Sequence, residues 1–431
     1  MGCQGAWVFP VSLFPILKSS SYLRPMKILH TSDWHLGQKL ISRDRTEEHQ
    51  LALDWLAQII DNEGIELLIV AGDVFDIGNP PHQARALYYG FLKKIIRTNC
   101  RHVVITGGNH DSPQMLNAPR ELLEILDVHV VGAATEDPSS QIMVLKDRNG
   151  EPEAVVAAVP FLRDQDLRRA ASSDGGQERI ERIKEGILSH YTAIGDAMAP
   201  FAKLKIPKIV TAHLCVTGAE ASDKQDNIYL GNVENIRADQ FPDVFGYVAL
   251  GHIHRPQAIG GMKQVRYSGS LIPLSFSETK DEKSVTLLEF KKDKLDKISL
   301  LTVPVGRRLK TIEGSLEEVQ EKLESLNERY KDELAPWVEV LVQTDRLIPN
   351  LNGLLHDFTK DMHLEILKLK VKNNHIPLDL QVANEQLEDL RPIDVFRKKL
   401  ESAGRPPEDA GELVATFQEL ETWMNERNEK Q

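Results

Sequence analysis

Between residues 26 and 305, five short apolar runs are each followed at once by residues that can bind a metal ion. The runs are Lys27–Thr31, Ile65–Val70, His102–Thr106, Ile209–Ala212 and Tyr247–Leu250. Their length and composition predict buried β-strands, and the amphipathic segments between them, such as Thr46–Asp61 and Gln83–Thr98, predict helices. This alternation is typical of an α/β fold, in which the carboxyl ends of the strands form one ligand-binding edge.

The residues that follow the five runs form motifs of unequal specificity. They are Asp33-x-His35, Gly72-Asp73-x-x-Asp76, Gly108-Asn109-His110-Asp111, the single His213 and Gly251-His252-x-His254. An Asp-x-His is expected by chance in a chain this long, whereas Gly-Asn-His-Asp arises by chance in roughly one such chain in a thousand. His213 has no motif of its own and is included because it lies between the third and fifth motifs. The ordered set, each member at the end of a predicted strand, argues against coincidence.

The side chains in these motifs predict a site for two metal ions. The seven candidate ligands are Asp33, His35, Asp73, Asn109, His213, His252 and His254. Imidazole, carboxylate and amide oxygen without thiolate favour Mn, Fe or Zn over a structural zinc or a calcium site. Seven ligands are too many for one ion and suit two if one carboxylate bridges them. Asp73, in the middle of the set, is the expected bridge.

The net charge of the chain bears on its substrate. The chain carries a formal charge of −12, whereas proteins held to nucleic acid by bulk charge are basic. A nucleic-acid substrate therefore requires a local source of positive charge. Two divalent cations bring four positive charges and Asp33 and Asp73 remove two, so the site keeps a surplus that can hold a phosphodiester.

His110 is the candidate acid of this site. It follows the expected ligand Asn109 and is in a position to donate a proton or hydrogen bond to a phosphoryl or leaving oxygen. Asp76 or Asp111 is the candidate carboxylate that orients it. The alternative is that His110 is a structural imidazole.

The motifs resemble those of the calcineurin-like metallophosphoesterase superfamily. The more specific cues are Ser32-Asp33-Trp34-His35-Leu36-Gly37, Gly72-Asp73-Val74-Phe75-Asp76 with Pro80-Pro81, Asn109-His110-Asp111-Ser112-Pro113, Leu250-Gly251-His252-Ile253-His254-Arg255-Pro256-Gln257, and Tyr267-Ser268-Gly269-Ser270 leading to Ser275-Phe276-Ser277-Glu278. The resemblance is specific from Met26 to about Gly314 and looser beyond. It implies a four-layer α/β/β/α sandwich with a dinuclear site. Within the superfamily, the chain looks like the bacterial nuclease subunits that work with a coiled-coil ATPase.

The resemblance also implies a distribution of ligands and an activity. It places Asp33, His35, Asp73 and His254 on one ion, and Asp73, Asn109, His213 and His252 on the other. Mn²⁺ is the implied metal, and His110 the group that acts on the transition state. The implied activity is a 3′-to-5′ double-strand exonuclease and endonuclease in DNA end and hairpin processing, repair and recombination. The implied assembly is a homodimer within a heterotetramer that contains the ATPase.

The sequence pattern predicts how the whole chain divides into domains and connecting segments. Residues 1–25 are expected to be an extension, 26–305 the metallophosphoesterase domain, 306–376 a small α/β capping and DNA-binding domain, 377–390 a linker and 391–431 a helical tail. Ser315 and Glu318 predict a capping box in the small domain. The apolar stripe that includes Leu413 and Phe417 predicts that the tail contacts a partner, which the resemblance implies is the ATPase, or else folds back on its own chain. The charged segment Asp164–Lys184 is expected to be a mobile insertion.

Other features narrow the class of protein. The three cysteines, Cys3, Cys100 and Cys215, form neither a disulfide framework nor a zinc-finger pattern, so a reducing cytoplasm is expected. No apolar run reaches the ~20 residues of a membrane span. The sequence has no Gly-x-x-x-x-Gly-Lys-Ser/Thr, so ATP dependence would come from a partner. Two alternatives remain: a phosphoesterase for a small-molecule or cyclic-nucleotide phosphodiester, and a non-catalytic scaffold.

Overall fold

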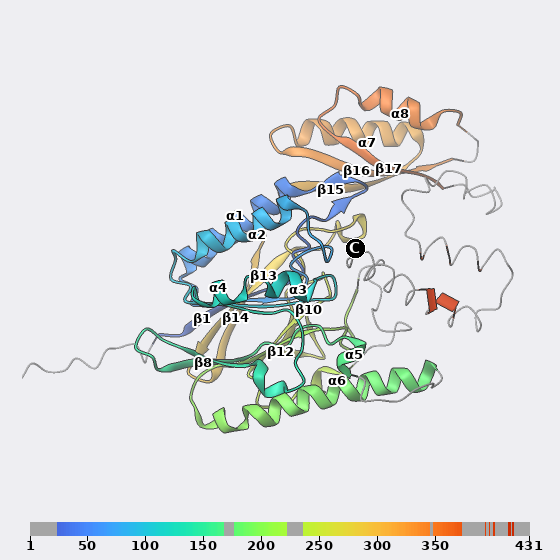
Figure 1. Cartoon of the computed structure of the whole chain (residues 1–431). Helices are drawn as coiled ribbons and strands as arrows, with labels where there is room; N and C mark the ends of the chain where they lie inside the picture. The colour runs from blue at the N-terminus through green and yellow to red at the C-terminus, as the bar shows by residue number, and fades with distance from the viewer. Residues whose placement is uncertain are drawn as a thin grey trace, which may run out of the picture.

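Two six-stranded sheets form the centre of the molecule (Figure 1). The computed structural model describes residues 24–167, 176–221, 236–344 and 348–372, and seven single positions between 393 and 417. The first sheet has the order β14 (Lys294–Thr302), β13 (Ser284–Lys291), β1 (Met26–Thr31), β4 (Leu67–Ala71), β5 (His102–Thr106) and β6 (Val128–Val131). The second has the order β11 (Gln257–Ile259), β12 (Met262–Tyr267), β10 (Tyr247–Gly251), β9 (Lys208–His213), β8 (Pro152–Ala157) and β7 (Ile142–Lys146).

Four neighbouring strands of each sheet run parallel. β1, β4, β5 and β6 pair in parallel in the first sheet, and β8, β9, β10 and β12 do so in the second. All residues of β4, β5, β9 and β10 are buried, as is usual for parallel strands covered on both faces. The five predicted strands are therefore present, and their carboxyl ends gather at one edge of each sheet.

Helices cover the outer face of each sheet and complete four layers. α1 (Thr46–Glu63) and α2 (His82–Ile95) pack on the first sheet, and α6 (Gly176–Met198) packs on the second (Figure 1). A third apolar cluster, which includes Ile69 and Ala249, fills the space between the sheets. The predicted α/β/β/α sandwich is confirmed.

Shorter elements connect these layers. They are β2 (Lys39–Leu40), β3 (Arg43–Asp44), α3 (Pro113–Asn117), α4 (Arg120–Glu124), α5 (Asp164–Leu167) and the 3₁₀ turns Pro138–Gln141, Ala199–Lys203, Ala238–Gln240 and Phe276–Glu278. The prediction of a mobile insertion over Asp164–Lys184 is wrong for the second half of that segment, because α6 already begins at Gly176. Ile183 and Ile187 of this helix are buried against the second sheet, and these buried contacts outweigh the charged composition.

A small unit follows the sandwich in the order β-α-β-α-β. It contains β15 (Arg307–Gly314), α7 (Leu316–Arg329), β16 (Leu334–Gln343), α8 (Leu351–Thr359) and β17 (Glu365–Lys372), with both strand pairs parallel. The capping box has formed: the Glu318 amide N–H donates to Ser315 Oγ at 3.3 Å, and the Ser315 amide donates to Glu318 Oε2 at 3.0 Å. The capping box predicted from the sequence is therefore present.

The small unit contacts the sandwich through an arginine and an aromatic ring. The Arg307 guanidinium donates to Glu48 Oε1 at 3.1 Å and lies 4.4 Å from the centre of the Trp337 ring. Leu40 and Phe276 of the sandwich pack with Leu309 and Trp337 in a separate apolar cluster.

The expected extension, linker and tail fall almost entirely outside the described residues. In the tail, the Phe396 and Phe417 rings stack with their centres 4.3 Å apart. No helix within the described ranges is both long and apolar enough to cross a membrane.

Candidate metal centre

The five motifs meet where the carboxyl edges of the two sheets come together. Asp33 and His35 follow β1, Asp73 follows β4, and Asn109 and His110 follow β5 in the first sheet. The second sheet supplies three imidazoles: His213 ends β9, and His252 and His254 follow β10. The structure thus brings all seven predicted ligands to the same edge.

The backbone at these positions is unusual. Asp33, His35, Asp73 and His252 have φ angles of 51°, 47°, 50° and 98°, a left-handed region in which Asp, Asn and His are several-fold enriched among non-glycine residues. The loops after β1 and β4 run side by side, because the Asp33 N–H donates to Gly72 O and the His35 N–H to Asp73 O, both at 3.0 Å. These turns direct the side chains into the space between the sheets.

Glycines at three of the motifs allow this close approach. A Cβ atom on Gly72 would lie 2.1 Å from His213 Nδ1, one on Gly108 would lie 2.0 Å from Asp73 Oδ1, and one on Gly251 would lie 1.8 Å from Ala71 O. The first and third of these contacts join the two sheets. No larger residue fits there unless the sheets move apart.

Asp73 lies at the centre of the group. Its Oδ2 is 3.2 Å from His213 Nε2 and 3.5 Å from His35 Nε2, and its Oδ1 accepts the His110 amide at 2.9 Å. Burial alone would raise the pKa of Asp73. The positive charges of His213 and His110 outweigh that effect and hold the pKa well below its usual range. Asp73 is therefore ionised and reaches both sides of the site.

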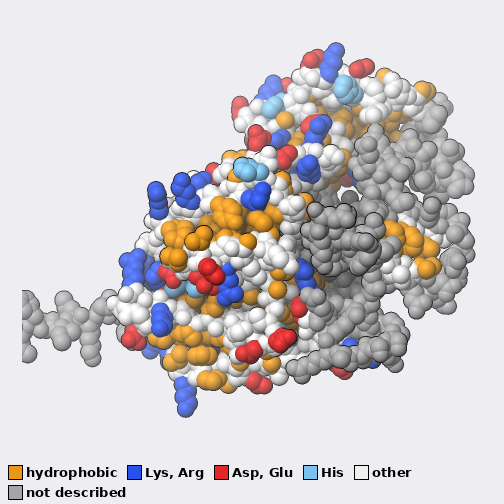
Figure 2. All heavy atoms as spheres, viewed as in Figure 1, with side chains coloured by type: hydrophobic (Ala, Val, Ile, Leu, Met, Phe, Trp, Pro, Cys, Tyr) orange, Lys and Arg blue, Asp and Glu red, His pale blue; other side chains and the backbone are white. Residues whose placement is uncertain are grey.

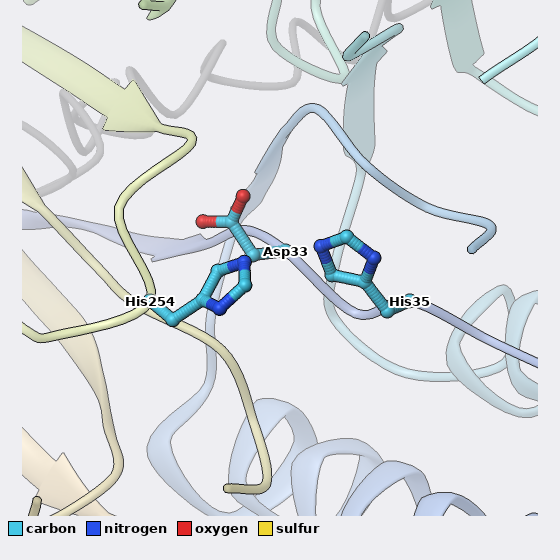
Figure 3. A group of neighbouring side chains, drawn as sticks. All are labelled: Asp33, His35 and His254. Atoms are coloured by element: carbon cyan, nitrogen blue, oxygen red, sulfur yellow. The ribbon is translucent and has the colours of Figure 1, made fainter. Parts of the chain in front are cut away.

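Asp33 links the first sheet to the second. Its Oδ1 accepts the His252 amide at 2.8 Å and its Oδ2 accepts the Ser32 hydroxyl at 2.6 Å. Asp33, His35 and His254 each offer a ligand atom within 4.8 Å of the others, and Figure 3 shows the three side chains around a common space. Asp33 forms a second such group with Asp73 and His213.

Four histidines are held by one nitrogen and present the other to the site. The Nδ1–H groups of His35, His213, His254 and His110 donate to Asp76 Oδ1 (3.1 Å), Ala71 O (3.0 Å), Glu278 Oε1 (3.1 Å) and Asp76 O (2.8 Å), respectively. Each of these acceptors lacks a proton to give, so Nδ1 is the donor in every case. Nε2 is then the atom available to a metal ion or a substrate.

The imidazoles differ in charge. Although burial lowers the pKa of His35, its bond to Asp76 and the nearby carboxylates raise it to about 9. His213 behaves similarly: Asp73 outweighs burial and raises the pKa to about 9. Burial and the positive charge of His213 instead lower the pKa of His252 well below its usual value. Without metal, protons on His35 and His213 balance the buried carboxylates.

Two family models match the chain. The model described as calcineurin-like phosphoesterase matches residues 26–256, and the model described as type 5 capsule protein repressor C-terminal domain matches residues 305–403. The SbcD subunit of the SbcCD nuclease from Escherichia coli K12 is 37% identical over 379 residues, which cover 87% of this chain and 92% of that protein. Its namesake in Rhodobacter capsulatus is 35% identical over 359 residues, covering 80% and 86%. The chain belongs to the SbcD family of calcineurin-like phosphoesterases. It is therefore a metal-dependent phosphoester hydrolase.

The residues of this SbcD-family site fit divalent metal ions. His35 Nε2 is buried without a hydrogen-bond partner, which leaves its lone pair for a ligand once the ring is neutral. His213 Nε2 lies 3.0 Å from Asn109 Oδ1, so imidazole and amide oxygen face the same space as Asp73. Mixed nitrogen and oxygen donors of this kind suit Mn, Fe or Zn.

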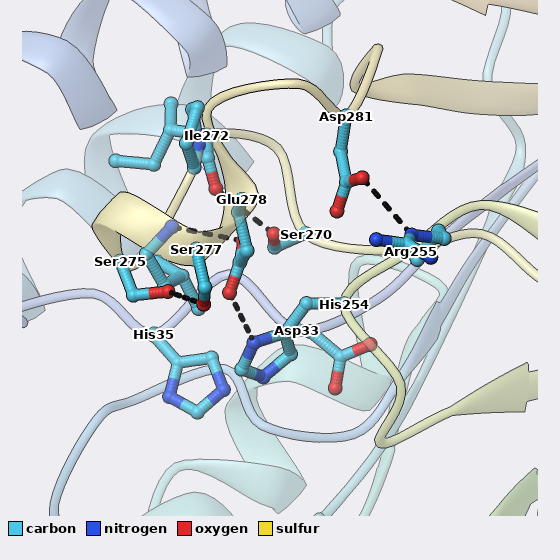
Figure 4. Close-up of polar contacts among 12 residues, drawn as sticks. Asp33, His35, His254, Arg255, Ser270, Ile272, Ser275, Ser277, Glu278 and Asp281 are labelled. Atoms are coloured by element: carbon cyan, nitrogen blue, oxygen red, sulfur yellow. Dashed lines mark hydrogen bonds and ion pairs between the residues drawn. The ribbon is translucent and has the colours of Figure 1, made fainter. Parts of the chain in front are cut away.

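Sequence reasoning missed two residues of this SbcD-family site. Glu278 accepts from His254 (Figure 4). It also accepts from the Leu274 amide at 3.0 Å and from Lys283 Nζ at 2.7 Å. Lys283 Nζ also donates to His254 O at 2.8 Å. Glu278 and Lys283 are buried, and together they hold His254 from two sides. The motif Ser275-Phe276-Ser277-Glu278 was a family cue, but sequence alone gave it no role.

The two carboxylates expected to orient His110 make other contacts. The His110 ring bonds to the main-chain oxygen of Asp76, while the Asp76 carboxylate bonds to His35. Asp111 accepts the amides of Val74, Phe75 and Gly108 at 3.0, 2.9 and 2.9 Å. Burial and the charge of Asp73 raise the pKa of Asp111 to about 6, against the effect of these donors. Asp111 thus ties the loops after β4 and β5 together.

Proposed function

We propose that this chain is the nuclease component of an SbcCD-type complex and hydrolyses phosphodiester bonds in DNA with two Mn²⁺ ions. The observation that supports this most strongly is the gathering of seven ligands from both sheets around the buried Asp73. The relatives that bear the name of the SbcCD nuclease match most of the chain. The nuclease activity proposed is a 3′-to-5′ exonuclease combined with an endonuclease.

The proposed ligand sets divide the site into two halves. Asp33, His35, Asp73 and His254 would hold one ion, and Asp73, Asn109, His213 and His252 the other. Bound there, the metal ions supply Lewis acidity to the phosphoryl group and lower the pKa of water. Asp33 also lies near Asp73 and His213, so its carboxylate faces both halves.

Local charge explains how an acidic chain can take an acidic substrate. On the face seen in Figure 2, basic side chains lie among acidic ones, and the whole chain carries −12. Two divalent ions exceed the charge of Asp33 and Asp73 by two. At the metal centre, the bound ions would then supply the positive charge that a phosphodiester needs.

His110 is the proposed proton donor. Its Nδ1–H is engaged with Asp76 O, so the exchangeable proton lies on Nε2. The residue is exposed and its ring centre lies 4.8 Å from that of His35, beside the site yet open to substrate. From there Nε2–H can donate to a phosphoryl oxygen or to the leaving oxygen. Asp76 and Asp111 act as positioning residues: Asp76 orients His35, and Asp111 fixes the loop that carries His110.

The assembly part of the proposal rests on the family. We propose an SbcC-type coiled-coil ATPase as partner, with this chain as a homodimer within a heterotetramer in the cytoplasm. The tail contact predicted from Leu413 and Phe417 lies largely outside the described residues and stays a prediction.

A nuclease assay tests the proposal. Linear duplex and hairpin DNA are incubated with the purified chain and Mn²⁺, with and without the ATPase, beside Asp73→Ala as control. Cleavage by the wild type alone, stimulated by ATP only when the ATPase is present, supports the proposal. Hydrolysis of cyclic nucleotides without cleavage of either DNA would favour the small-molecule phosphodiesterase instead.

A further inference from the structure

A second group of potential metal ligands lies at the other end of β5. His102 is the first residue of β5, and Asp127 and His129 flank the first residue of β6. One ligand atom from each of the three lies within 4.8 Å of the others. The parallel pairing of the strands sets this arrangement: the Val103 amide donates to Asp127 O at 3.0 Å, and His129 lies opposite Val104.

This group is separate from the dinuclear centre. Asn109 and His110 follow the carboxyl end of β5, whereas His102 is at its amino end. At ~3.3 Å per residue, the strand and the turn after it separate His102 from Asn109 by roughly 20 Å. The three residues are outside the motifs and the proposed ligand sets.

His102 has the environment of a metal-bound histidine. Its side chain is buried, with 5% of the residue exposed, and its Nε2 lies 2.8 Å from Glu153 Oε1 and 3.0 Å from Lys146 O. Both partners are acceptors, so Nε2 carries the proton. Nδ1 is buried and has no hydrogen-bond partner. A carboxylate that holds one ring nitrogen while the other is free is the usual support of a histidine ligand.

The carboxylate behind His102 is itself fixed in place. Arg101 Nε donates to Glu153 Oε1 at 3.0 Å and Arg101 Nη2 to Glu153 Oε2 at 2.5 Å. His102 is therefore held with its Nε2 toward Glu153 and its Nδ1 free.

We propose that His102, Asp127 and His129 bind one divalent transition-metal ion, with Zn²⁺ the best match. Two imidazoles and one carboxylate are a zinc donor set, whereas Mg²⁺ and Ca²⁺ prefer oxygen alone. The ion would join β5 to β6 and, through Glu153 on β8, would connect the two sheets at the end opposite the dinuclear centre. Its expected effect is to stabilise the sandwich.

Metal content measures this site directly. The wild type, Asp127→Asn and His129→Gln are each saturated with Zn²⁺, dialysed free of excess, and assayed for zinc per chain. Asn tolerates the left-handed backbone of Asp127, whose φ is 55°. His356→Ala is the matched control, because His356 is an exposed histidine on α8 far along the chain. We expect the first two variants to bind one equivalent less than the wild type and the control to bind the same amount.

Two further readouts separate this site from the dinuclear centre. Mn²⁺-dependent hydrolysis should be equal in all four proteins, and Zn²⁺ should raise the Tm of Asp127→Asn and His129→Gln less than that of the wild type. Anomalous density at the zinc edge, in crystals of the wild type, should lie between His102 and His129. Equal zinc content in the wild type and both variants, or no density at that position, would overturn the proposal.

Discussion

The sheet that contains β1, β4 and β5 carries Asp33, Asp73 and Asn109, whereas the sheet that contains β9 and β10 supplies only imidazoles. In each proposed ligand set, the first sheet provides the anionic ligands and the second completes the coordination. Neither sheet holds a complete set, so the site exists only while the two are packed together. The two sheets approach each other closely beside the site at Gly72, which lies against His213, and at Gly251, which lies against Ala71.

The largest effect is expected from Asp73, the carboxylate that belongs to both proposed ligand sets. Asp73→Ala removes the negative charge that faces His35 and His213, and should abolish two-ion binding and hydrolysis together. Calorimetric titration with Mn²⁺ and a nuclease assay measure the two properties. An Asp73→Ala chain that still bound two ions tightly would contradict the proposal that the first sheet supplies an anionic ligand common to both ions.

Next in size is the loss of His110, which belongs to the carboxylate-bearing sheet but is no proposed ligand. His110→Ala should keep both ions and lose about 10²–10⁴-fold in hydrolysis, the usual contribution of a general acid or base. Mn²⁺ stoichiometry should equal that of the wild type. If the variant instead lost an ion, His110 would have to be counted among the ligands.

The packing of the sheets can be tested without removing any ligand. Gly251→Ala places a methyl group against Ala71 O and should displace β10 from β4, with a loss of roughly 10²-fold in hydrolysis, as expected for a misplacement of about 1 Å. Gly90→Ala in α2 is the matched control, because nothing lies within 4 Å of its added Cβ and alanine favours helices. Comparable activity of both variants would show that sheet spacing does not govern the site.

A smaller loss is expected when a residue behind one of the histidine ligands of the second sheet is replaced. Glu278→Gln removes the charge that holds His254 and pairs with Lys283, and should weaken Mn²⁺ affinity about 10–100-fold, as is usual for residues behind a ligand. Glu282→Gln, whose carboxylate bonds only to the exposed Thr302 hydroxyl among the bonds described, serves as control. If the Mn²⁺ affinity of Glu278→Gln were unchanged, the backbone of His254 would be enough to orient its ring and the bond to Glu278 would not be needed.

The smallest effect is a pH dependence that differs among the imidazoles. The pKa of His35 and of His213 is raised from 6.5 to about 9 in the metal-free chain, so their ion pairs stabilise the fold fully below about pH 6.5 and are lost as the pH rises through about 9. Mn²⁺ must displace these protons, so its affinity should rise over the same interval. The Mn²⁺-induced increase in Tm should therefore be greater at pH 9 than at pH 7. An equal increase at both would contradict the raised pKa values.

The sequence predicted the strands, and the meeting of the seven candidate ligands at one edge, because each motif is local: a buried run followed by polar residues places those residues at a sheet edge. The support behind the ligands was harder to predict because it is not local. Glu278 reaches His254 across 24 residues, and the carboxylate of Asp76 bonds to His35 rather than to His110 because the loops after β1 and β4 lie side by side. The start of α6 was not predicted because many of the residues there are charged and only a few apolar residues, such as Ile183, pack on the sheet.

The left-handed backbone at Asp33, His35, Asp73 and His252 limits what mutation can do at these positions. In a saturation library selected only for folding, Asn and Gly should persist at 33 and 73, while β-branched residues should be depleted, because positive φ excludes them. Neither Asn nor Gly replaces the carboxylate. A descendant that had lost its metal chemistry would therefore still accept only a few residue types at these four positions. Its sequence would continue to resemble that of a metal site after the activity had been lost.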